Sequence, residues 1–255
     1  MSWPEPRVVA FVDILGFREI FARRARGEDD EVNEKFYLEL KNVFEGVFWP
    51  EQVRRDFLES QFEDDGVEPV EATYFSDNIV ISISRAASGA EMRIIRRCRN
   101  VYLGLLENGF PARGGVAYGV THHKESMVFG EGIMRAYDLE SKLANYPRII
   151  VERAIRRELM KHRHGSSEPF PLLEGWSGLP YIDMFGGLGG DDIERLRNCR
   201  KVVGEGLWRA LSGDRPDIVE KWLWLRRSIN GEIRRMVLLR RGEFGMIPAK
   251  GLEPE

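Results

Sequence analysis

Two aspartates stand where strands would bring them together. Asp13 directly follows the apolar, β-branched run 8–12, and Asp77 lies in the polar turn 76–78 between two further β-branched runs. Two carboxylates held close repel each other unless a cation lies between them, and their hard oxygen atoms suit Mg²⁺ or Mn²⁺. The pair therefore predicts a metal site. Two ions about 4 Å apart would activate an attacking oxygen and clamp a triphosphate there.

The segment that follows Asp13 offers a place for phosphate. It stands where the strand passes into a helical pattern, so its backbone N–H groups are expected at the positive end of a helix. The predicted phosphate-binding residues are Ile14, Leu15, Gly16 and Phe17. In an ordinary interpretation, Asp13 is only a helix N-cap and Asp77 only a turn residue. The strand order favours the metal site.

The order of elements predicts the fold that positions these residues. Strands are expected at 8–12, 70–75, 79–84, 113–120, 127–129 and 148–151, and helices within 18–62 and at 90–108 and 132–143. This order predicts an α+β fold, a ferredoxin-like sheet with an added hairpin and with helices packed on one face. Glycines in the strand 113–120 allow another backbone or a ligand to approach closely.

The C-terminal hundred residues follow a different pattern. A basic helix at 152–164, a short strand at 181–185, helices at 191–212 and 215–230 and a final strand at 236–239 are expected there. We expect residues 7–152 to form the catalytic core and residues 153–255 to be an α/β elaboration of the same domain.

Composition excludes several classes of protein. The 255 residues carry 38 Lys and Arg against 41 Asp and Glu, a net charge of −3, which fits neither a disordered acidic tail nor a basic nucleic-acid coat. No apolar run is long enough to span a membrane, and the N-terminus lacks the pattern of a signal peptide. We expect a soluble, cytoplasmic protein with no nucleic-acid or membrane partner. Cys98 and Cys199 are too few for a zinc site, and His122 and His123 are expected in a solvated turn.

Four segments resemble, in order and spacing, the catalytic domain of the class III nucleotidyl cyclases. They are 11–17, 75–77, 113–119 and 130–141. The chain is most similar to the pyrimidine cyclases of the bacterial Pycsar anti-phage systems, which make cyclic UMP or cyclic CMP. The resemblance covers about residues 7–152. It implies a ferredoxin-like cyclase core, a homodimer with active sites at its interface, and two Mn²⁺ or Mg²⁺ ions held by Asp13, Asp77 and the carbonyl of Ile14.

The departures from the family concern the recognition of purine bases. Adenylyl cyclases of this class carry a base-reading lysine where this chain has Thr73, and an asparagine and a transition-state arginine where it has Met134 and Asp138. The resemblance therefore implies a pyrimidine substrate, UTP in preference to CTP. Arg113 is the predicted catalytic replacement for the missing arginine. Arg135 is the other candidate for this replacement and is predicted to bind the nucleotide.

Tyr74 and Tyr137 have two interpretations. Either ring stacks on a small base, or both are buried core aromatics, which is the simpler interpretation. The expected reaction is attack of the ribose 3′-OH on the α-phosphate, giving a 3′,5′-cyclic monophosphate and pyrophosphate as part of antiviral defence. The alternatives are an inactive nucleotide-binding homologue acting as a regulatory module, and a polymerase-like or diguanylate cyclase palm, although the hairpin 75–78 carries no GGDEF-type motif.

Overall fold

The computed structural model describes residues 4–17, 38, 41, 70–162, 170–175, 178–186, 193–213 and 215–244. The helical stretch expected at 18–62 lies almost entirely outside the described residues. The chain divides into two compact units, Met1–Ile182 and Asp183–Glu255. The core expected at residues 7–152 lies within the first unit, and its assignment as the catalytic core stays a prediction.

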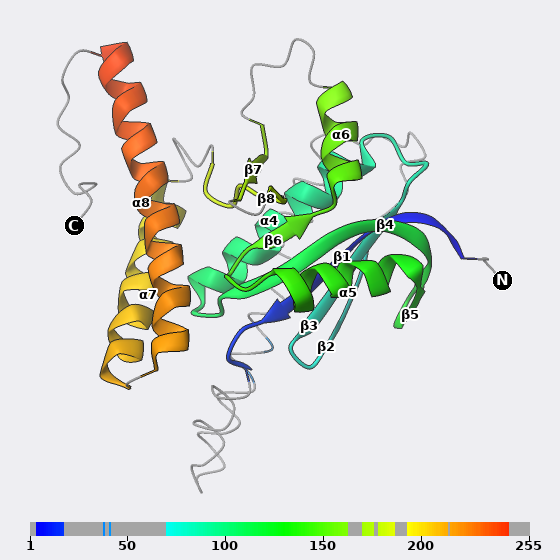
Figure 1. The fold of residues 1–255 in the computed structure, drawn as a ribbon, viewed down its shortest axis with the longest axis horizontal. Coiled ribbons are helices and arrows are strands. Elements are labelled where there is room, and N and C mark those ends of the chain that lie inside the picture. The colour runs from blue at the N-terminus through cyan, green and yellow to red at the C-terminus, as the bar shows by residue number, and fades with distance from the viewer. Residues whose placement is uncertain are drawn as a thin grey trace, which may run out of the picture. The chain divides into compact units, whose positions relative to one another are not determined.

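The first unit is built on an eight-stranded sheet (Figure 1). Its strands are β1 (Glu5–Ile14), β2 (Glu71–Phe75), β3 (Asn78–Ser84), β4 (Ala112–Lys124), β5 (Met127–Gly130), β6 (Ile149–Val151), β7 (Leu172–Glu174) and β8 (Pro180–Ile182). They lie in the order β2-β3-β1-β4-β6-β8-β7, and β5 pairs with β4. The first four are antiparallel in the order β2-β3-β1-β4, which is the ferredoxin-like order. The predicted α+β fold is therefore confirmed.

Helices cover both faces of this sheet. Figure 1 shows α5 (Glu131–Leu143) in front of the sheet along β4, and α4 (Ala90–Glu107) behind it. Accordingly Val8, Ala10 and Val12 on one face of β1 are as fully buried as Val9 on the other. The prediction of helices on one face is therefore wrong, because residues 8–12 of β1 are apolar on both faces and need cover on both sides. A third helix, α6 (Arg153–Lys161), follows β6.

Glycines let α5 lie directly on the backbone of β4. A Cβ on Gly115 would overlap the carbonyl oxygen of Ala136 and come within 2.6 Å of Cβ of Leu139. A Cβ on Gly119 would overlap the backbone of Gly132 in the same helix. The close approach predicted for this strand is thus made by a helix. As a result α5 runs along β4 with its C-terminal half beside Gly115.

The second unit contains the helices α7 (Ile193–Ser212) and α8 (Pro216–Phe244). They pack closely at Gly206, where a Cβ would lie 2.6 Å from Cε2 of the Trp222 indole. The final strand expected at 236–239 is wrong, because this segment continues α8. Ile229 and Ile233, four residues apart and both buried, extend the helical apolar face past the expected end at residue 230.

The two cysteines lie in the interior of the protein. Cys98 and Cys199 are both buried, and burial raises the pKa of the Cys98 thiol to about 12. Both cysteines are therefore core residues. Within the described part of the chain, no helix is long and apolar enough to cross a membrane.

Candidate active site

One row of residues crosses the sheet at the end of β1. In this row Asp13 is paired with Asn78 of β3 on one side and with Arg113 of β4 on the other. Directly opposite residues in antiparallel strands place their side chains on the same face. Asp77 immediately precedes Asn78, and the carbonyl oxygen of Asp77 accepts a 2.8 Å hydrogen bond from the N–H of Ile14. The structure therefore places Asp13, Asp77 and Arg113 at one end of the sheet.

Arg113 lies between two carboxylates. Its Nε is 3.3 Å from Oδ2 of Asp13 and 2.6 Å from Oε1 of Glu140 on α5. Its Nη1 also donates to the carbonyl oxygen of Ala144, at 3.5 Å. The side chains of Arg113 and Asp13 are 27% and 20% exposed, whereas that of Glu140 is 3% exposed. Arg113 of β4 is thus paired with Glu140 of α5 and also contacts Asp13, the predicted metal ligand.

Glu140 is a site residue that the sequence analysis did not identify. Burial raises the pKa of its carboxyl group to about 6, Arg113 opposes that shift, and Asp13 adds to it. Its position, four residues after the fully buried Ala136, puts a carboxylate on the apolar stripe of an amphipathic helix. A carboxylate on the apolar side of a helix could have indicated this site from the sequence, because a buried carboxylate needs a cation beside it.

The turn after β1 has fewer amides for phosphate than predicted. The N–H of Ile14 donates to Asp77, and the N–H of Leu15 donates to the carbonyl oxygen of Pro111 at 2.8 Å. In this conformation neither amide is available to a ligand. Gly16 has a positive φ of 73°, which suits glycine. The phosphate-binding role of Gly16 and Phe17 stays a prediction.

The structure pairs Arg135 with carboxylates other than Asp13 and leaves both tyrosines exposed. Arg135 forms ion pairs with Glu131, at 3.3 Å, and with Glu152. The position beside Asp13 is therefore held by Arg113. Tyr74 and Tyr137 are 53% and 50% exposed, so their interpretation as buried core aromatics is wrong.

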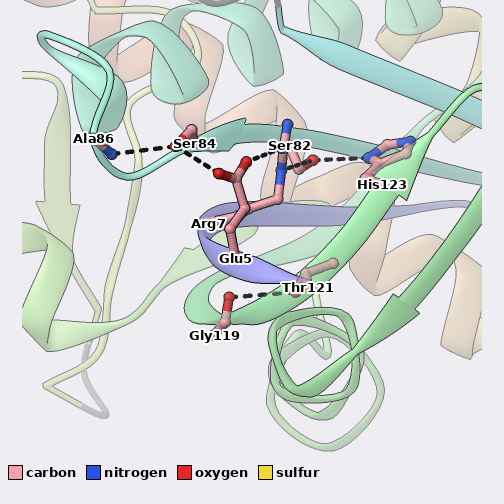
Figure 2. Close-up of polar contacts among 8 residues, drawn as sticks. All are labelled: Glu5, Arg7, Ser82, Ser84, Ala86, Gly119, Thr121 and His123. Atoms are coloured by element: carbon pink, nitrogen blue, oxygen red, sulfur yellow. Dashed lines mark hydrogen bonds and ion pairs between the residues drawn. The ribbon is translucent and has the colours of Figure 1, made fainter. Parts of the chain in front are cut away.

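A buried chain of hydrogen bonds lies on the same face of the sheet, towards the other end of β1 (Figure 2). Arg7 Nε donates to Ser82 Oγ at 2.9 Å, and Ser82 Oγ lies 2.8 Å from Nδ1 of His123. Nε2 of His123 lies 2.9 Å from Oγ1 of Thr73, which donates to the carbonyl oxygen of Glu125 at 2.7 Å. The expected solvated turn at His123 is therefore wrong, because β4 continues through this residue and buries it.

The directions of these hydrogen bonds fix the state of the imidazole. The hydroxyl hydrogen of Thr73 goes to Glu125, so Thr73 accepts from the N–H at Nε2 of His123. Nδ1 is then the acceptor and Ser82 its donor. A second proton has no place in this arrangement. Burial, with Arg7 and His122 nearby, lowers the pKa of His123 to about 4.

The residues at the end of β1 fit a divalent cation bound together with substrate. Among the described residues there is no group of three His, Cys, Asp or Glu side chains that could hold a metal ion. Mg²⁺ commonly takes only one or two protein carboxylates and completes its shell with water and substrate phosphates. Asp13 and Asp77 match that requirement. Arg113 can keep Glu140 as its partner when Asp13 turns to a cation, so its charge need not exclude the metal.

Neither a protein-family model nor a curated protein matches the chain. Among solved structures, the adenylyl cyclase CyaB from P. aeruginosa is similar over 70% of this chain and 92% of its own, with 12% identity and a TM-score of 0.38. An adenylate/guanylate cyclase/hydrolase from Silicibacter pomeroyi is similar over 71% of this chain and 95% of its own, with 13% identity and a TM-score of 0.41. A class III adenylyl cyclase-like ATP-binding protein from Pseudomonas aeruginosa is similar over 89% of this chain and 45% of its own, with 14% identity and a TM-score of 0.39.

Proposed function

We propose that this chain is a metal-dependent nucleotidyl cyclase that converts UTP, or CTP, to the 3′,5′-cyclic monophosphate and pyrophosphate. The observation that carries the proposal is the placing of Asp13 and Asp77 on neighbouring strand ends, with Arg113 between Asp13 and the buried Glu140. The resemblance of the segments around these residues to class III cyclases supplies the reaction. Following the Pycsar resemblance, the cyclic nucleotide serves as a signal in bacterial anti-phage defence.

In the proposed reaction Asp13, Asp77 and the carbonyl of Ile14 hold two Mn²⁺ or Mg²⁺ ions. When bound, the ions make the ribose 3′-OH more acidic and neutralise charge on the triphosphate. The 3′-oxygen forms a bond to the α-phosphorus, the bond to the β-phosphate oxygen breaks, and the hydroxyl proton passes to solvent. Arg113, held by Glu140, donates to the phosphate oxygens on which charge develops. The residues thus mainly position the substrate and neutralise its charge.

A pyrimidine substrate is supported by the side chain at the base-reading position. Thr73 replaces the lysine of the adenylyl cyclases, and its hydroxyl is already bonded to His123 and to the carbonyl of Glu125. This hydroxyl is held by the end of β4 and offers no long cationic arm to a purine. Tyr74, next in the strand, is exposed, but its cross-strand neighbours Ile79 and Val12 put it on the face of the sheet opposite Thr73 and Asp13.

The homodimer is supported by exposed apolar side chains of the first unit. They belong to the hairpins β2–β3 and β4–β5 and to α5. About half or more of each of these side chains is exposed: Tyr74, Phe75, Met127, Phe129, Met134 and Tyr137. Large apolar side chains left this exposed favour burial against a partner. A second copy of the chain that covers this surface would complete an active site at the interface.

Incubation of the purified protein with each of the four NTPs and Mn²⁺ tests the proposal. The wild type should release pyrophosphate and a cyclic pyrimidine nucleotide, and Asp77→Asn should reduce the rate by at least about a hundredfold. Asp217→Asn, which makes the same chemical change at an exposed position of α8, is the matched control and should keep the wild-type rate. Full activity of Asp77→Asn would refute the proposed role of the carboxylates.

The missing asparagine and arginine of the family motivate a second candidate function, an inactive nucleotide-binding homologue that acts as a regulatory module. It predicts tight binding of UTP or CTP with no release of pyrophosphate from any NTP. Measurable cyclic product excludes it.

A further inference from the structure

The second unit carries a basic groove between α7 and α8. The groove has a volume of about 350 Å³ and is lined by Arg197, Arg200, Lys201, Val203, Gly204, Arg226, Ile229 and Asn230. Four of these side chains are cationic, and none of the described lining residues is acidic. Since the whole chain has a net charge of −3, the local excess of positive charge does not follow from overall composition.

Three of the cations stand on one face of α7. Arg197, Arg200 and Lys201 have the spacing i, i+3 and i+4, at which helical side chains are neighbours and like charges destabilise the helix. Arg197 pairs with Glu194 at 3.1 Å, on the same helix. Lys201 makes no ion pair with any residue that the structure describes. A bound anion would relieve the repulsion among these side chains.

The groove also has room for a ligand between the charges. Its floor contains Val203 and Ile229, both almost fully buried. Gly204 lies one turn after Arg200, and a Cβ added there would meet no atom within 4 Å. The space beside Gly204 is therefore open, and Gly204 lines the groove together with the four cationic side chains.

We propose that this groove binds the oligophosphate chain of a small ligand. Guanidinium groups match phosphate oxygens with two parallel hydrogen bonds, and the Lys201 ammonium and Asn230 amide add further donors. A compact oligophosphate suits a short groove in which four cations face one space. A nucleic-acid strand instead follows an extended basic track. This site is separate from Asp13 and Asp77 and does not depend on the cyclase reaction.

The oligophosphate has two possible sources, a nucleotide or an inorganic oligophosphate, and Trp208 distinguishes them. Its side chain is 70% exposed and stands four residues after Gly204, about 6 Å further along the same face of α7. An exposed indole at the end of a phosphate site provides a stacking surface for a base. Nucleotide binding should therefore depend on Trp208, whereas binding of tripolyphosphate should not.

Calorimetric titration of the full chain with tripolyphosphate and with UTP, in EDTA and about 0.15 M salt, where exposed charges more than about 8 Å apart are largely screened, tests this inference. Removing divalent ions keeps metal-bound nucleotide away from Asp13 and Asp77, and Asp77→Asn should bind both probes as the wild type does. Gly204→Glu places a carboxylate in the open space and should weaken binding of both by about tenfold or more. The matched control Gly231→Glu, also in open space on α8 but outside the groove lining, should change affinity less than about twofold.

The results separate the possibilities. Weaker UTP binding by Trp208→Ala with unchanged tripolyphosphate binding assigns the groove to a nucleotide, and no effect on either probe assigns it to an inorganic oligophosphate. The inference is overturned if neither probe binds the wild type at millimolar concentration. It is also overturned if Gly204→Glu, folded by circular dichroism, binds as tightly as Gly231→Glu.

Discussion

Acidification should destabilise the sheet of the first unit through His123. In the folded protein the pKa of His123 is lowered to about 4 from 6.5, chiefly by burial and then by Arg7. The unfolded chain therefore takes up this proton first as the pH falls. Stability is lost progressively as the pH decreases from about 6.5 to about 4, and above that range the imidazole is neutral in both states.

The two pKa values set the size of the effect. About 2 kcal/mol of stability should be lost by about pH 5 and about 3 kcal/mol by about pH 4. A loss of about 2 kcal/mol corresponds to an approximately 30-fold lower protection of the amides against hydrogen exchange. His123 donates and accepts within a chain that links β1, β3 and β2, so the loss should appear in the peptides of β1 and β3.

Hydrogen exchange with mass spectrometry at about pH 7 and about pH 5, corrected for the intrinsic exchange rates, measures this loss. His123→Gln removes the titrating group, so its sheet should be less stable overall but should lack this part of the pH dependence. His122→Gln keeps His123 and should keep the pH dependence. If the wild-type sheet loses no more protection on acidification than the sheet of His123→Gln, His123 is not the group whose protonation destabilises it.

Packing and charge lead to expectations for four further variants. Gly115→Ala pushes α5 away from β4 and should destabilise the sheet by about 2 kcal/mol, seen as faster hydrogen exchange in β4, whereas equal exchange contradicts the close contact. Gly206→Ala forces the Trp222 ring aside and should destabilise α7 and α8 by about 2 kcal/mol in urea unfolding followed by tryptophan fluorescence. In the same measurement Gly204→Ala, which meets no atom, should be neutral or stabilising by up to about 1 kcal/mol. Glu140→Gln removes one of the two carboxylates that pair with Arg113, so Arg113 should pair more strongly with Asp13 and compete with the metal. The Mn²⁺ concentration for half-maximal cyclase rate should therefore rise by about tenfold. An unchanged Mn²⁺ concentration contradicts the role of Glu140 as the anchor of Arg113.

The local patterns of the sequence predict the parts of the site that depend on neighbouring residues. The apolar run 8–12 predicts a strand buried on both faces, and Asp13 and Asp77 follow from strand ends and turn chemistry. The glycines of β4 predict a close approach, which needs no knowledge of the partner. These features are encoded within a few residues of where they act.

Glu140 and His123 could not be placed in the same way. Their burial depends on contacts between segments that are distant in sequence. Arg113 must lie under α5 before Glu140 has a cation, and β4 must reach Ser82 and Thr73 before His123 has partners. The end of α8 fails as a strand for a related reason. The four apolar residues 236–239 fit a strand or a helix equally well, and the packing of the preceding helical turns decides for the helix.

Competition among the four nucleotides tests whether this chain cyclises a pyrimidine nucleotide. The wild-type protein would be given equal concentrations of ATP, GTP, CTP and UTP with Mn²⁺, and the products would be separated and identified by mass. Cyclic UMP, or cyclic CMP, is expected as the main product, formed with one pyrophosphate per cyclic nucleotide. Cyclic AMP or cyclic GMP as the main product, or four intact triphosphates, would rule out the proposed pyrimidine cyclase activity.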